Sequence, residues 1–115
     1  MMPATIFCDI DGTIIAHRDC GQWSGDPEPV PGAVEQMHRW HRQGHLIVLT
    51  TARSEDTRQN TEAELEEVGV PWDRLVMDLT VGPRVLINDA APERPVAAVA
   101  YSLARDEGLG QVVIP

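Results

Sequence analysis

The sequence predicts an α/β domain built on a mainly parallel sheet. Short apolar runs alternate with stretches of helical periodicity, and the connections between them are brief. The first runs are continuously apolar, as in strands buried on both faces. With 115 residues, 43% of them hydrophobic and 23% charged, the chain fits one globular domain over residues 1–115.

Runs of apolar or β-favouring residues predict six strands, of which the last two are the weaker. They cover residues 4–8, 45–50, 75–77, 84–88, 96–101 and 112–114. Three of the first four runs end in carboxylate, hydroxyl or amide side chains. Right-handed crossovers would bring those three ends to one edge of the sheet, where open α/β sheets bind their ligands.

The first helix is expected to begin at Pro31 and Gly32 and to stop at Gly44. Three histidines, His38, His41 and His45, follow one another here at spacings of three and four. A metal site is one interpretation, but Gly44 interrupts the helix and arginines lie among them. We therefore expect a solvated helix face.

The second helix is expected to start at Ser54 or Asp56 and to end at Gly69. Its core-facing positions recur at helical spacing, at Thr61, Leu65 and Val68. The acidic residues among them are expected to form a solvated face: Glu62, Glu64, Glu66 and Glu67.

A polar, Gly- and Pro-rich stretch at about 13–30 separates the first strand from the first helix and is expected to form a loop or small flap. Within it, Trp23 is expected to anchor the loop as a hydrophobic plug, with gating of a pocket as the alternative. Cys8 lies in the first apolar run and is expected to be a small core residue rather than half of a disulfide.

The charge balance limits the classes of partner. A net charge of −9 and a pI near 4.7 argue against sequence-independent binding to nucleic acid or to an anionic membrane. With no apolar run of about 18 residues and no signal peptide, a cytoplasmic protein without membrane contact is expected. A homo-oligomer is compatible with the three tryptophans, which suit an interface as well as a core.

The stretch "FCDIDGTII" places Asp9 and Asp11 two residues apart at the end of the first strand. Residues i and i+2 of a strand point to the same side, so these carboxylates repel one another unless a cation or a proton lies between them. Because Mg²⁺ prefers oxygen ligands, we expect Asp9 and Asp89, from separate strand ends, to bind it. Asp9 could then act as a nucleophile and Asp11 as a general acid/base.

Two further residues suit a phosphate-transfer site. Thr51 offers a hydroxyl where the second strand ends, and the helix after it directs its positive end to the same region. Gly12 permits a tight backbone whose N–H groups can approach a phosphate.

These residues resemble a known family. "DIDGT" resembles motif I of the haloacid dehalogenase-like (HAD) phosphohydrolases, "LIVLTTAR" is similar to their motif II, and "VLINDAAP" to their motif IV, in the same order over residues 3–92. The resemblance implies a three-layer Rossmann-like fold with Mg²⁺, in which Asp9 is nucleophile and metal ligand and Asp11 is acid/base and main-chain ligand. It further implies that Thr51 binds phosphate and Asp89 binds the metal. Neither usual insertion point holds a domain, so the chain resembles a capless member.

Two positions depart from the family pattern. Motif III is a lysine, and all nine basic residues here are arginine. Arg84 is the nearest replacement cation and Arg53 is the other candidate, since arginine can bind phosphate bidentately. Asn88 stands where the first residue of the acidic pair usually lies, where it can orient a water behind the metal ligands.

The leading hypothesis is a Mg²⁺-dependent phosphomonoesterase that acts on a small or accessible phosphate ester through an aspartyl phosphate. The missing lysine motivates an alternative, a catalytically weak or inactive module that binds a phosphorylated ligand or regulates a partner. The second alternative is a polynucleotide-end phosphatase, motivated by the arginines Arg39, Arg42 and Arg53 and opposed by the negative charge.

Overall fold

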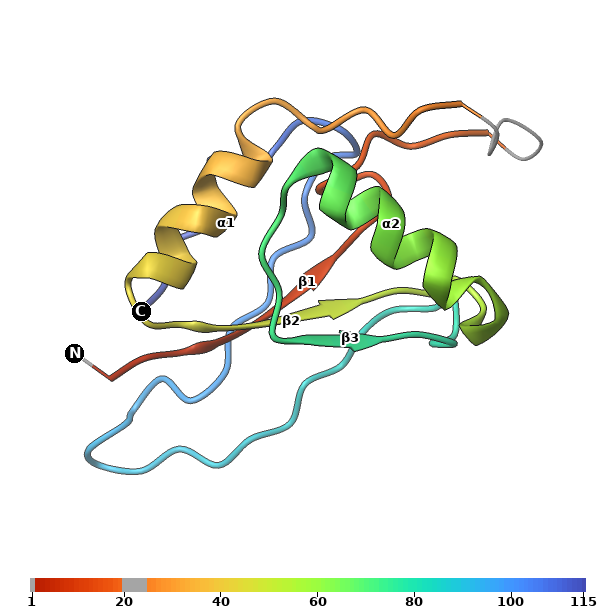
Figure 1. The fold of residues 1–115 in the computed structure, drawn as a ribbon. Helices are drawn as coiled ribbons and strands as arrows, with labels where there is room; N and C mark the ends of the chain where they lie inside the picture. The colour runs from red at the N-terminus through yellow and green to blue at the C-terminus, as the bar shows by residue number, and fades with distance from the viewer. Residues whose placement is uncertain (1, 20–24) are drawn as a thin grey trace.

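Three strands and two helices alternate along the chain as far as Val76 (Figure 1). The structure, a computed structural model, describes residues 2–19 and 25–115. The elements follow the order β1 (Thr5–Asp9), α1 (Ala33–Arg42), β2 (Leu46–Thr50), the 3₁₀ turn η1 (Glu55–Thr57), α2 (Arg58–Val68) and β3 (Arg74–Val76). Both helices and the first three strands therefore lie within a few residues of the predicted ranges.

The sheet has the order β1-β2-β3 and all its pairs are parallel. Both crossovers step in the same direction across the sheet, and crossovers of the same hand then place their helices on the same face. Figure 1 shows α1 and α2 together on one side of the sheet. The predicted α/β class with a parallel sheet and no cap domain is confirmed. Its expected third layer is not formed, because no helix among the described residues covers the opposite face.

The core lies between the sheet and the two helices. Cys8, Leu49 and Leu75 are neighbours across the three strands, and all three are buried on the helix-covered face. Met37 of α1 and Leu65 of α2 belong to the same cluster and are fully buried. This packing orients the strands so that the ends of β1 and β2 lie side by side.

The stretch between β1 and α1, which we call the arm (residues 13–30), is held at its base by backbone pairing. Ala16 N–H donates to the Glu28 carbonyl and Val30 N–H to the Ile14 carbonyl, both at 2.7 Å. Ile14 and Val30 are buried in the core, so the base of the arm is fixed. Trp23, the predicted plug, lies outside the described residues.

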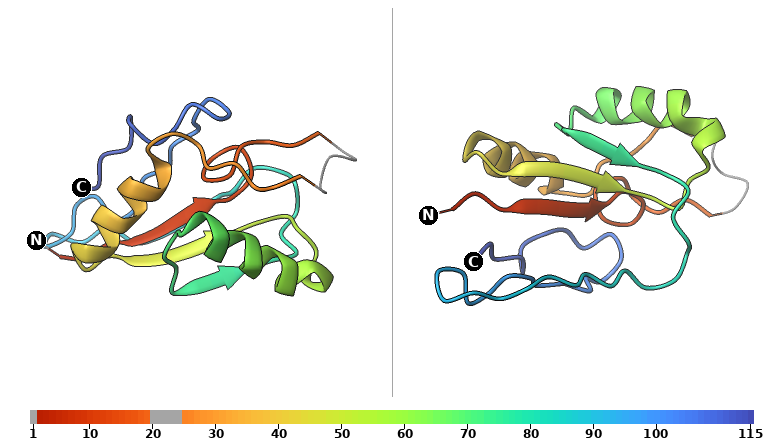
Figure 2. Two further views of the ribbon diagram at one scale, coloured as in Figure 1. Left: turned by 45° about the horizontal axis from the view of Figure 1, so that its top comes forward. Right: turned by 90° about the horizontal axis from the view of Figure 1, so that it is seen from below.

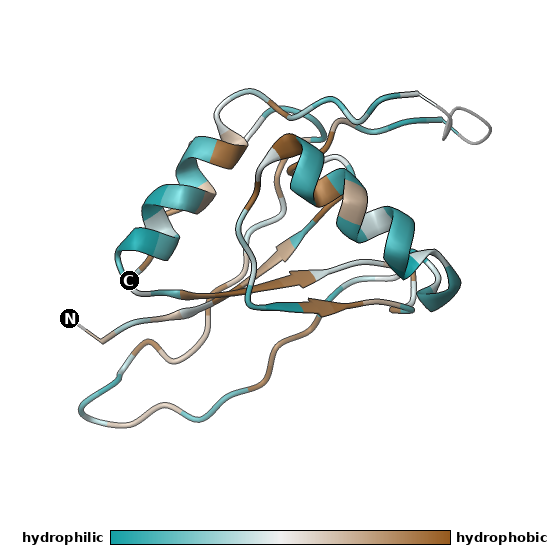
Figure 3. Cartoon of the chain, in the orientation of Figure 1, coloured by the Kyte–Doolittle hydropathy of each residue, from teal (hydrophilic) through white to brown (hydrophobic). Residues whose placement is uncertain are grey.

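The chain after β3 forms no further strand among the described residues. The predicted strands at 84–88, 96–101 and 112–114 are wrong: residues 79–115, the C-terminal segment, run irregularly, and the side chains of Val85 and Ile87 are 80% and 90% exposed. Figure 2 shows part of this segment running past the β1 side of the sheet. Figure 3 shows that it carries apolar stretches of its own. The composition of these residues favours strands, but a strand forms only when it can pair with the edge of a sheet. The described residues of this segment do not pair with the sheet.

The three histidines divide between surface and core. His41 is exposed on α1, as predicted, but His45, the residue before β2, is buried, and its Nδ1 accepts the Ala4 N–H at 2.8 Å. The predicted solvated face is therefore wrong for His45. Neither helix has the length and apolar character that crossing a bilayer would require.

Candidate functional site

A hollow of about 620 Å³ opens at the carboxyl ends of β1 and β2. It is lined by strand-end residues, by the loop into α2 and by parts of the C-terminal segment: Asp9, Asp11, Thr51, Ala52, Arg53, Ser54, Thr57, Asn60, Val81, Arg84 and Arg105. Asp9 and Thr50 are register partners in the parallel pair, so the residues that follow each strand emerge beside one another. The sheet edge predicted from the sequence therefore carries a hollow with both charged and hydroxyl side chains.

Asp9, the last residue of β1, has a half-exposed side chain at this hollow. Its Oδ2 accepts a long hydrogen bond of 3.5 Å from the Thr13 hydroxyl, and Arg84 Nη2 lies 3.7 Å from its Oδ1. Partial burial raises the pKa of the Asp9 carboxyl, while the Ile10 N–H and Arg84 act in the opposite direction. A second cation near Asp9 would favour its ionised form further.

Asp11 is held by Arg53. The guanidinium donates from Nε to Oδ2 at 2.9 Å and from Nη2 to Oδ1 at 2.7 Å, a bidentate pair. The Arg53 side chain is only 8% exposed. The two aspartates predicted from "DIDGT" thus have separate cationic neighbours.

Arg53 also reaches a second carboxylate, Glu64 of α2, whose Oε1 accepts from Nη1 at 2.8 Å. Arg18 of the arm binds Glu64 bidentately, at 2.9 and 2.8 Å. The Arg18 hydrogen bond is the largest influence on the pKa of Glu64 and lowers it; burial raises it, and Arg53 lowers it. The prediction that Glu64 belongs to a solvated face is wrong. Its spacing of three residues from Thr61, on the predicted core face, was the signal that could have revealed this.

Thr51 follows β2 directly, is buried and is one of the residues that line the hollow. Its Oγ1 accepts the Arg53 N–H at 3.0 Å, and its own N–H donates to the Val76 carbonyl at 3.0 Å. The hydroxyl proton is free to turn toward a phosphate oxygen, since a threonine hydroxyl both donates and accepts.

Two other arginines line the hollow. Arg84, a predicted phosphate-binding residue, donates from Nη1 to the Thr80 and Gly82 carbonyls at 3.4 and 3.2 Å. Sequence reasoning missed Arg105, which lies 94 residues beyond Asp11 and carried no motif. Within the part of the chain that the structure describes, the Arg105 guanidinium has neither a hydrogen-bond nor an ion-pair partner.

Gly12 explains how Arg105 reaches the hollow. Gly12 has φ +84°, and a Cβ there would lie 3.3 Å from Arg105 Cγ. The Gly12 carbonyl accepts the Asp106 N–H at 2.8 Å, so the C-terminal segment is fastened to the loop after β1. The Gly12 N–H itself donates to the Ile15 carbonyl at 2.7 Å, so the structure does not offer it to a phosphate as we predicted.

The predicted motif IV residues lie away from this constellation. Asp89 does not line the hollow, and its Oδ1 is 3.2 Å from Arg94 Nη2. Asn88 donates to the Ala97 carbonyl at 3.1 Å. The expected convergence of Asp9, Thr51 and Asp89 is therefore met for the first two alone. The reason is the missing fourth strand, which would have carried Asp89 to the sheet edge.

The donor set limits which metal could bind. Among the residues described, no three His, Cys, Asp or Glu side chains gather as a metal site. Mg²⁺ in enzymes is often held by only one or two carboxylates together with substrate phosphate and water. The half-exposed Asp9 carboxylate fits that modest requirement, with the Asp11 main-chain carbonyl as the second ligand that the family resemblance implies. A preformed cage is not present in the described residues.

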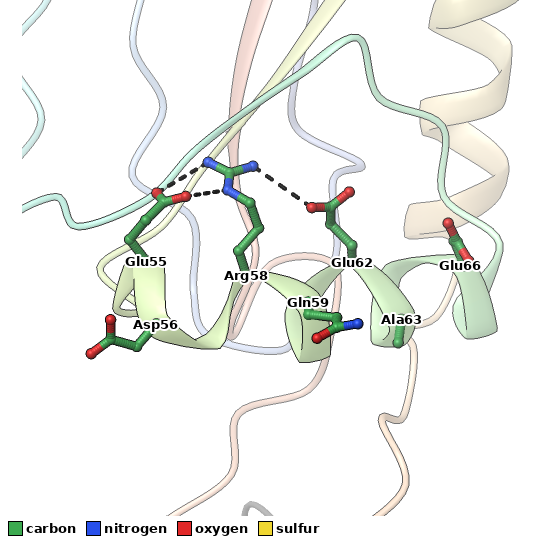
Figure 4. Close-up of a pocket in the computed structure, with 7 residues that line it drawn as sticks. All are labelled: Glu55, Asp56, Arg58, Gln59, Glu62, Ala63 and Glu66. Atoms are coloured by element: carbon green, nitrogen blue, oxygen red, sulfur yellow. Dashed lines mark hydrogen bonds and ion pairs between the residues drawn. The ribbon is translucent and has the colours of Figure 1, made fainter.

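A second hollow, of about 590 Å³, lies along η1 and α2 (Figure 4). Arg58 points between Glu55, to which it is hydrogen-bonded, and Glu62, whose Oε2 lies 3.9 Å from its Nη1. Such i,i+3 and i,i+4 pairs stabilise an exposed helix surface. This is the solvated acidic face that the sequence predicted, without the chemistry of the first hollow.

The family model described as "PITM 1-3, LNS2 domain" matches residues 6–85, which is more than half of the chain. The chain belongs to the LNS2 domain family. This family is part of the HAD-like superfamily, so the match supports the resemblance seen in "DIDGT" at the level of the superfamily. The matched range contains the arm, both helices, β2, β3 and all of β1 except Thr5 of this LNS2 domain, together with Arg84.

A crystal structure of an MCSG target from Vibrio cholerae has a similar fold. It superposes with a TM-score of 0.54 and 21% sequence identity, over 82% of this chain and 85% of that chain. At that identity the likeness shows the fold alone. No curated protein matches the chain.

Proposed function

We propose that this LNS2 domain is a Mg²⁺-dependent phosphomonoesterase that works through an aspartyl phosphate on Asp9. One observation carries the proposal: Asp9, Asp11 and Thr51 line a single hollow that Arg84 and Arg105 also line. Carboxylate oxygens, a hydroxyl and guanidinium groups are the partners that a phosphoryl group and its metal require. Membership in a HAD-like family agrees with this chemistry.

The reaction assigns one role to each carboxylate. An Asp9 oxygen attacks phosphorus, the bond from phosphorus to the ester oxygen breaks, and Asp11 in its protonated form donates its proton to the departing alkoxide. Asp11 then removes a proton from water, and that water attacks the aspartyl phosphate, which releases inorganic phosphate and restores the Asp9 carboxylate. The pair with Arg53 leaves a lone pair on each Asp11 oxygen, so proton transfer does not require the pair to break.

The cation that replaces the family lysine is proposed to be Arg105, with Arg84 beside it. Arg53 is committed to Asp11 and Glu64, and Arg84 is bound to two carbonyls. The Arg105 guanidinium can turn to a phosphoryl oxygen without breaking any contact recorded for the described residues. A cation that is preorganised toward the phosphoryl group is worth a factor of about 10² to 10³ in rate, and the turn that Arg105 has to make places its contribution below that range.

The metal is proposed to be held by the Asp9 carboxylate and the Asp11 main-chain carbonyl, with substrate phosphate and water as further ligands. When bound, Mg²⁺ would neutralise negative charge on the phosphoryl oxygens. The proposed substrate is a small or accessible phosphate ester, because no cap domain among the described residues covers the hollow and the net charge of −9 opposes a polyanion. The proposed location of the protein is the cytoplasm.

The first test is release of p-nitrophenol from its phosphate ester by the native chain and by Asp9→Asn, with and without EDTA. We expect release that needs Mg²⁺ and that falls to background in Asp9→Asn, since the amide is not a nucleophile. Asp19→Asn, an exposed aspartate in the arm, is the matched control and should retain the native rate. Equal release from Asp9→Asn and the native chain would refute the proposed intermediate.

The alternative of a weak binding or regulatory module keeps one observation in its favour, the bidentate hold of Arg53 on Asp11. A panel of phosphate esters without turnover, combined with calorimetric binding of Mg²⁺ or inorganic phosphate, would favour it.

The three arginines that motivated the polynucleotide-end alternative do not share one environment. Arg53 is buried in ion pairs, whereas Arg39 and Arg42 are exposed on α1.

A further inference from the structure

Four charged side chains form a continuous series of ion pairs between the arm and the hollow. In order they are Arg18, Glu64, Arg53 and Asp11, with positive and negative charges alternating. The series consists of two bidentate pairs, Arg18 with Glu64 and Arg53 with Asp11. A 2.8 Å hydrogen bond between Arg53 Nη1 and Glu64 Oε1 joins the two pairs. The set links three places in the fold: the arm, α2 and the loops after β1 and β2.

These pairs are held away from water. The side chains of Arg18, Glu64 and Arg53 are 10%, 10% and 8% exposed, while that of Asp11, at the hollow, is 23% exposed. A charge so placed is retained only where partners satisfy it, because burying an unpaired ion is costly. Thr61 supplies a further partner, accepting from Arg53 Nη1 at 3.2 Å. The contacts therefore fix the direction of the Arg53 guanidinium plane.

The position of Glu64 matters most, because its carboxylate contacts both arginines. It lies on the buried side of α2, beside the fully buried Leu65, so the helix cannot turn it outward without exposing core. Arg53 lies in the loop after β2, where its N–H donates to Thr51 Oγ1 and its carbonyl accepts the Asp78 N–H, so its backbone is held while the direction of its guanidinium depends on side-chain partners. Without the Glu64 carboxylate, the guanidinium groups of Arg18 and Arg53 would lose the negative charge that both of them contact.

We propose that Glu64 is a positioning residue that fixes Arg53, and through it Asp11, in the orientation needed for proton transfer, with Arg18 of the arm completing the set. The consequence for catalysis rests on the proposed phosphatase function; the geometric part does not. The arm and the acid/base are then coupled: a substitution of Arg18 should change the orientation of Asp11 through the two intervening side chains, Glu64 and Arg53.

The test compares the native chain with Glu64→Gln, which keeps the shape of the side chain and removes its charge. Glu67→Gln is the matched control, since Glu67 is an exposed glutamate on the same helix. Two quantities are measured on each folded variant: kcat and KM for p-nitrophenyl phosphate with Mg²⁺, and the rate at which the Arg53 Nε–H exchanges with water, from ¹⁵N-resolved NMR.

We expect Glu64→Gln to lower kcat by about 10- to 100-fold with little change in KM, as for a misplaced catalytic group. The exchange of the Arg53 Nε–H should accelerate at least tenfold, since that proton is donated to Asp11 in the native chain. Glu67→Gln should change neither quantity. A role in stability alone would lower the unfolding midpoint and leave both quantities unchanged in the folded protein.

The outcomes separate the two proposals. Unchanged Arg53 exchange in folded Glu64→Gln overturns the positioning role, and so does accelerated exchange with an unchanged kcat. Accelerated exchange in a protein that shows no hydrolysis in any form, native included, supports the geometry and refutes the phosphatase. If Glu64→Gln does not fold, Arg18→Gln carries the test. It should accelerate Arg53 exchange several-fold, and no change there overturns the proposal.

Discussion

The loop after β1 provides the sharpest test of how the hollow is built. Gly12 combines two constraints, a positive φ of +84° and a neighbour, Arg105 Cγ, 3.3 Å from where a Cβ would lie. Gly69, the residue that ends α2, has almost the same backbone conformation at φ +82° and has nothing within 4 Å of its would-be Cβ. Gly12→Ala and Gly69→Ala therefore share the free-energy cost of placing an alanine at positive φ, and only Gly12→Ala adds a close contact with Arg105.

The magnitudes follow from these two terms. An alanine in the left-handed region costs about 1–2 kcal/mol, and this applies to both variants. The contact at Gly12 adds less than about 1 kcal/mol, because Arg105 is exposed and its side chain can shift by a few tenths of an ångström, unlike a core neighbour. With an m value of about 2 kcal/mol/M, the shared cost lowers the urea midpoint by about 0.5–1 M.

The activities should separate the variants where the stabilities do not. The small shift of Arg105 away from the phosphoryl group is expected to lower kcat/KM by up to about 10-fold in Gly12→Ala, whereas Gly69→Ala should keep the native value. Urea unfolding followed by the fluorescence of the tryptophans, which include the buried Trp40, gives the stabilities, and aryl phosphate hydrolysis gives the rates. Native activity in Gly12→Ala would show that the contact with Arg105 does not govern the hollow. An equal loss in Gly69→Ala would assign the effect to global destabilisation.

Two further predictions concern titratable groups. Burial, with a smaller contribution from Asp9, raises the pKa of Cys8 to about 12, so this thiol is protonated at pH 8. In the Cys20→Ser variant, where Cys8 is the remaining thiol, Ellman's reagent should react with the folded protein only as fast as the protein unfolds. A rapid reaction would contradict the burial of Cys8. The pKa of Glu64 is lowered from its ordinary 4.5, chiefly by Arg18, so its contribution to stability is present above pH 4.5 and is lost as the pH falls through the lower folded-state value. The midpoint of urea unfolding should thus fall less steeply between about pH 5 and pH 3 in Glu64→Gln than in the native chain, and parallel curves would contradict the ion pairs drawn for Glu64.

The first part of the fold could be predicted because its signals are local. The apolar run that ends in "DIDGT" gave β1 and the position of Asp9, and the run from His45 to Thr50 gave β2 and Thr51. Glycines at 44 and 69 marked where the helices end. Each of these features depends on residues within a few positions of one another, so a single sequence is enough to locate them.

The C-terminal segment shows where such reasoning stops. "RVLIN" has the composition of a strand, yet strand formation depends on an edge with which to pair, and the described structure leaves these residues irregular. The predicted place of Asp89 failed with it, since the carboxylate was expected at the end of a strand that does not form.

The sequence by itself determined the parallel α/β core and the two aspartates at the end of β1, because periodicity and motif spacing are properties of neighbouring residues. The absence of lysine is a matter of composition and was equally plain from the sequence. Only the tertiary structure decided which charges meet. It buried Glu64 between Arg18 and Arg53, committed Arg53 to Asp11, and carried Arg105 to Gly12 across more than 90 residues. Such pairings depend on the packing of α2 and of the C-terminal segment against loops distant in sequence, and no local pattern records that packing.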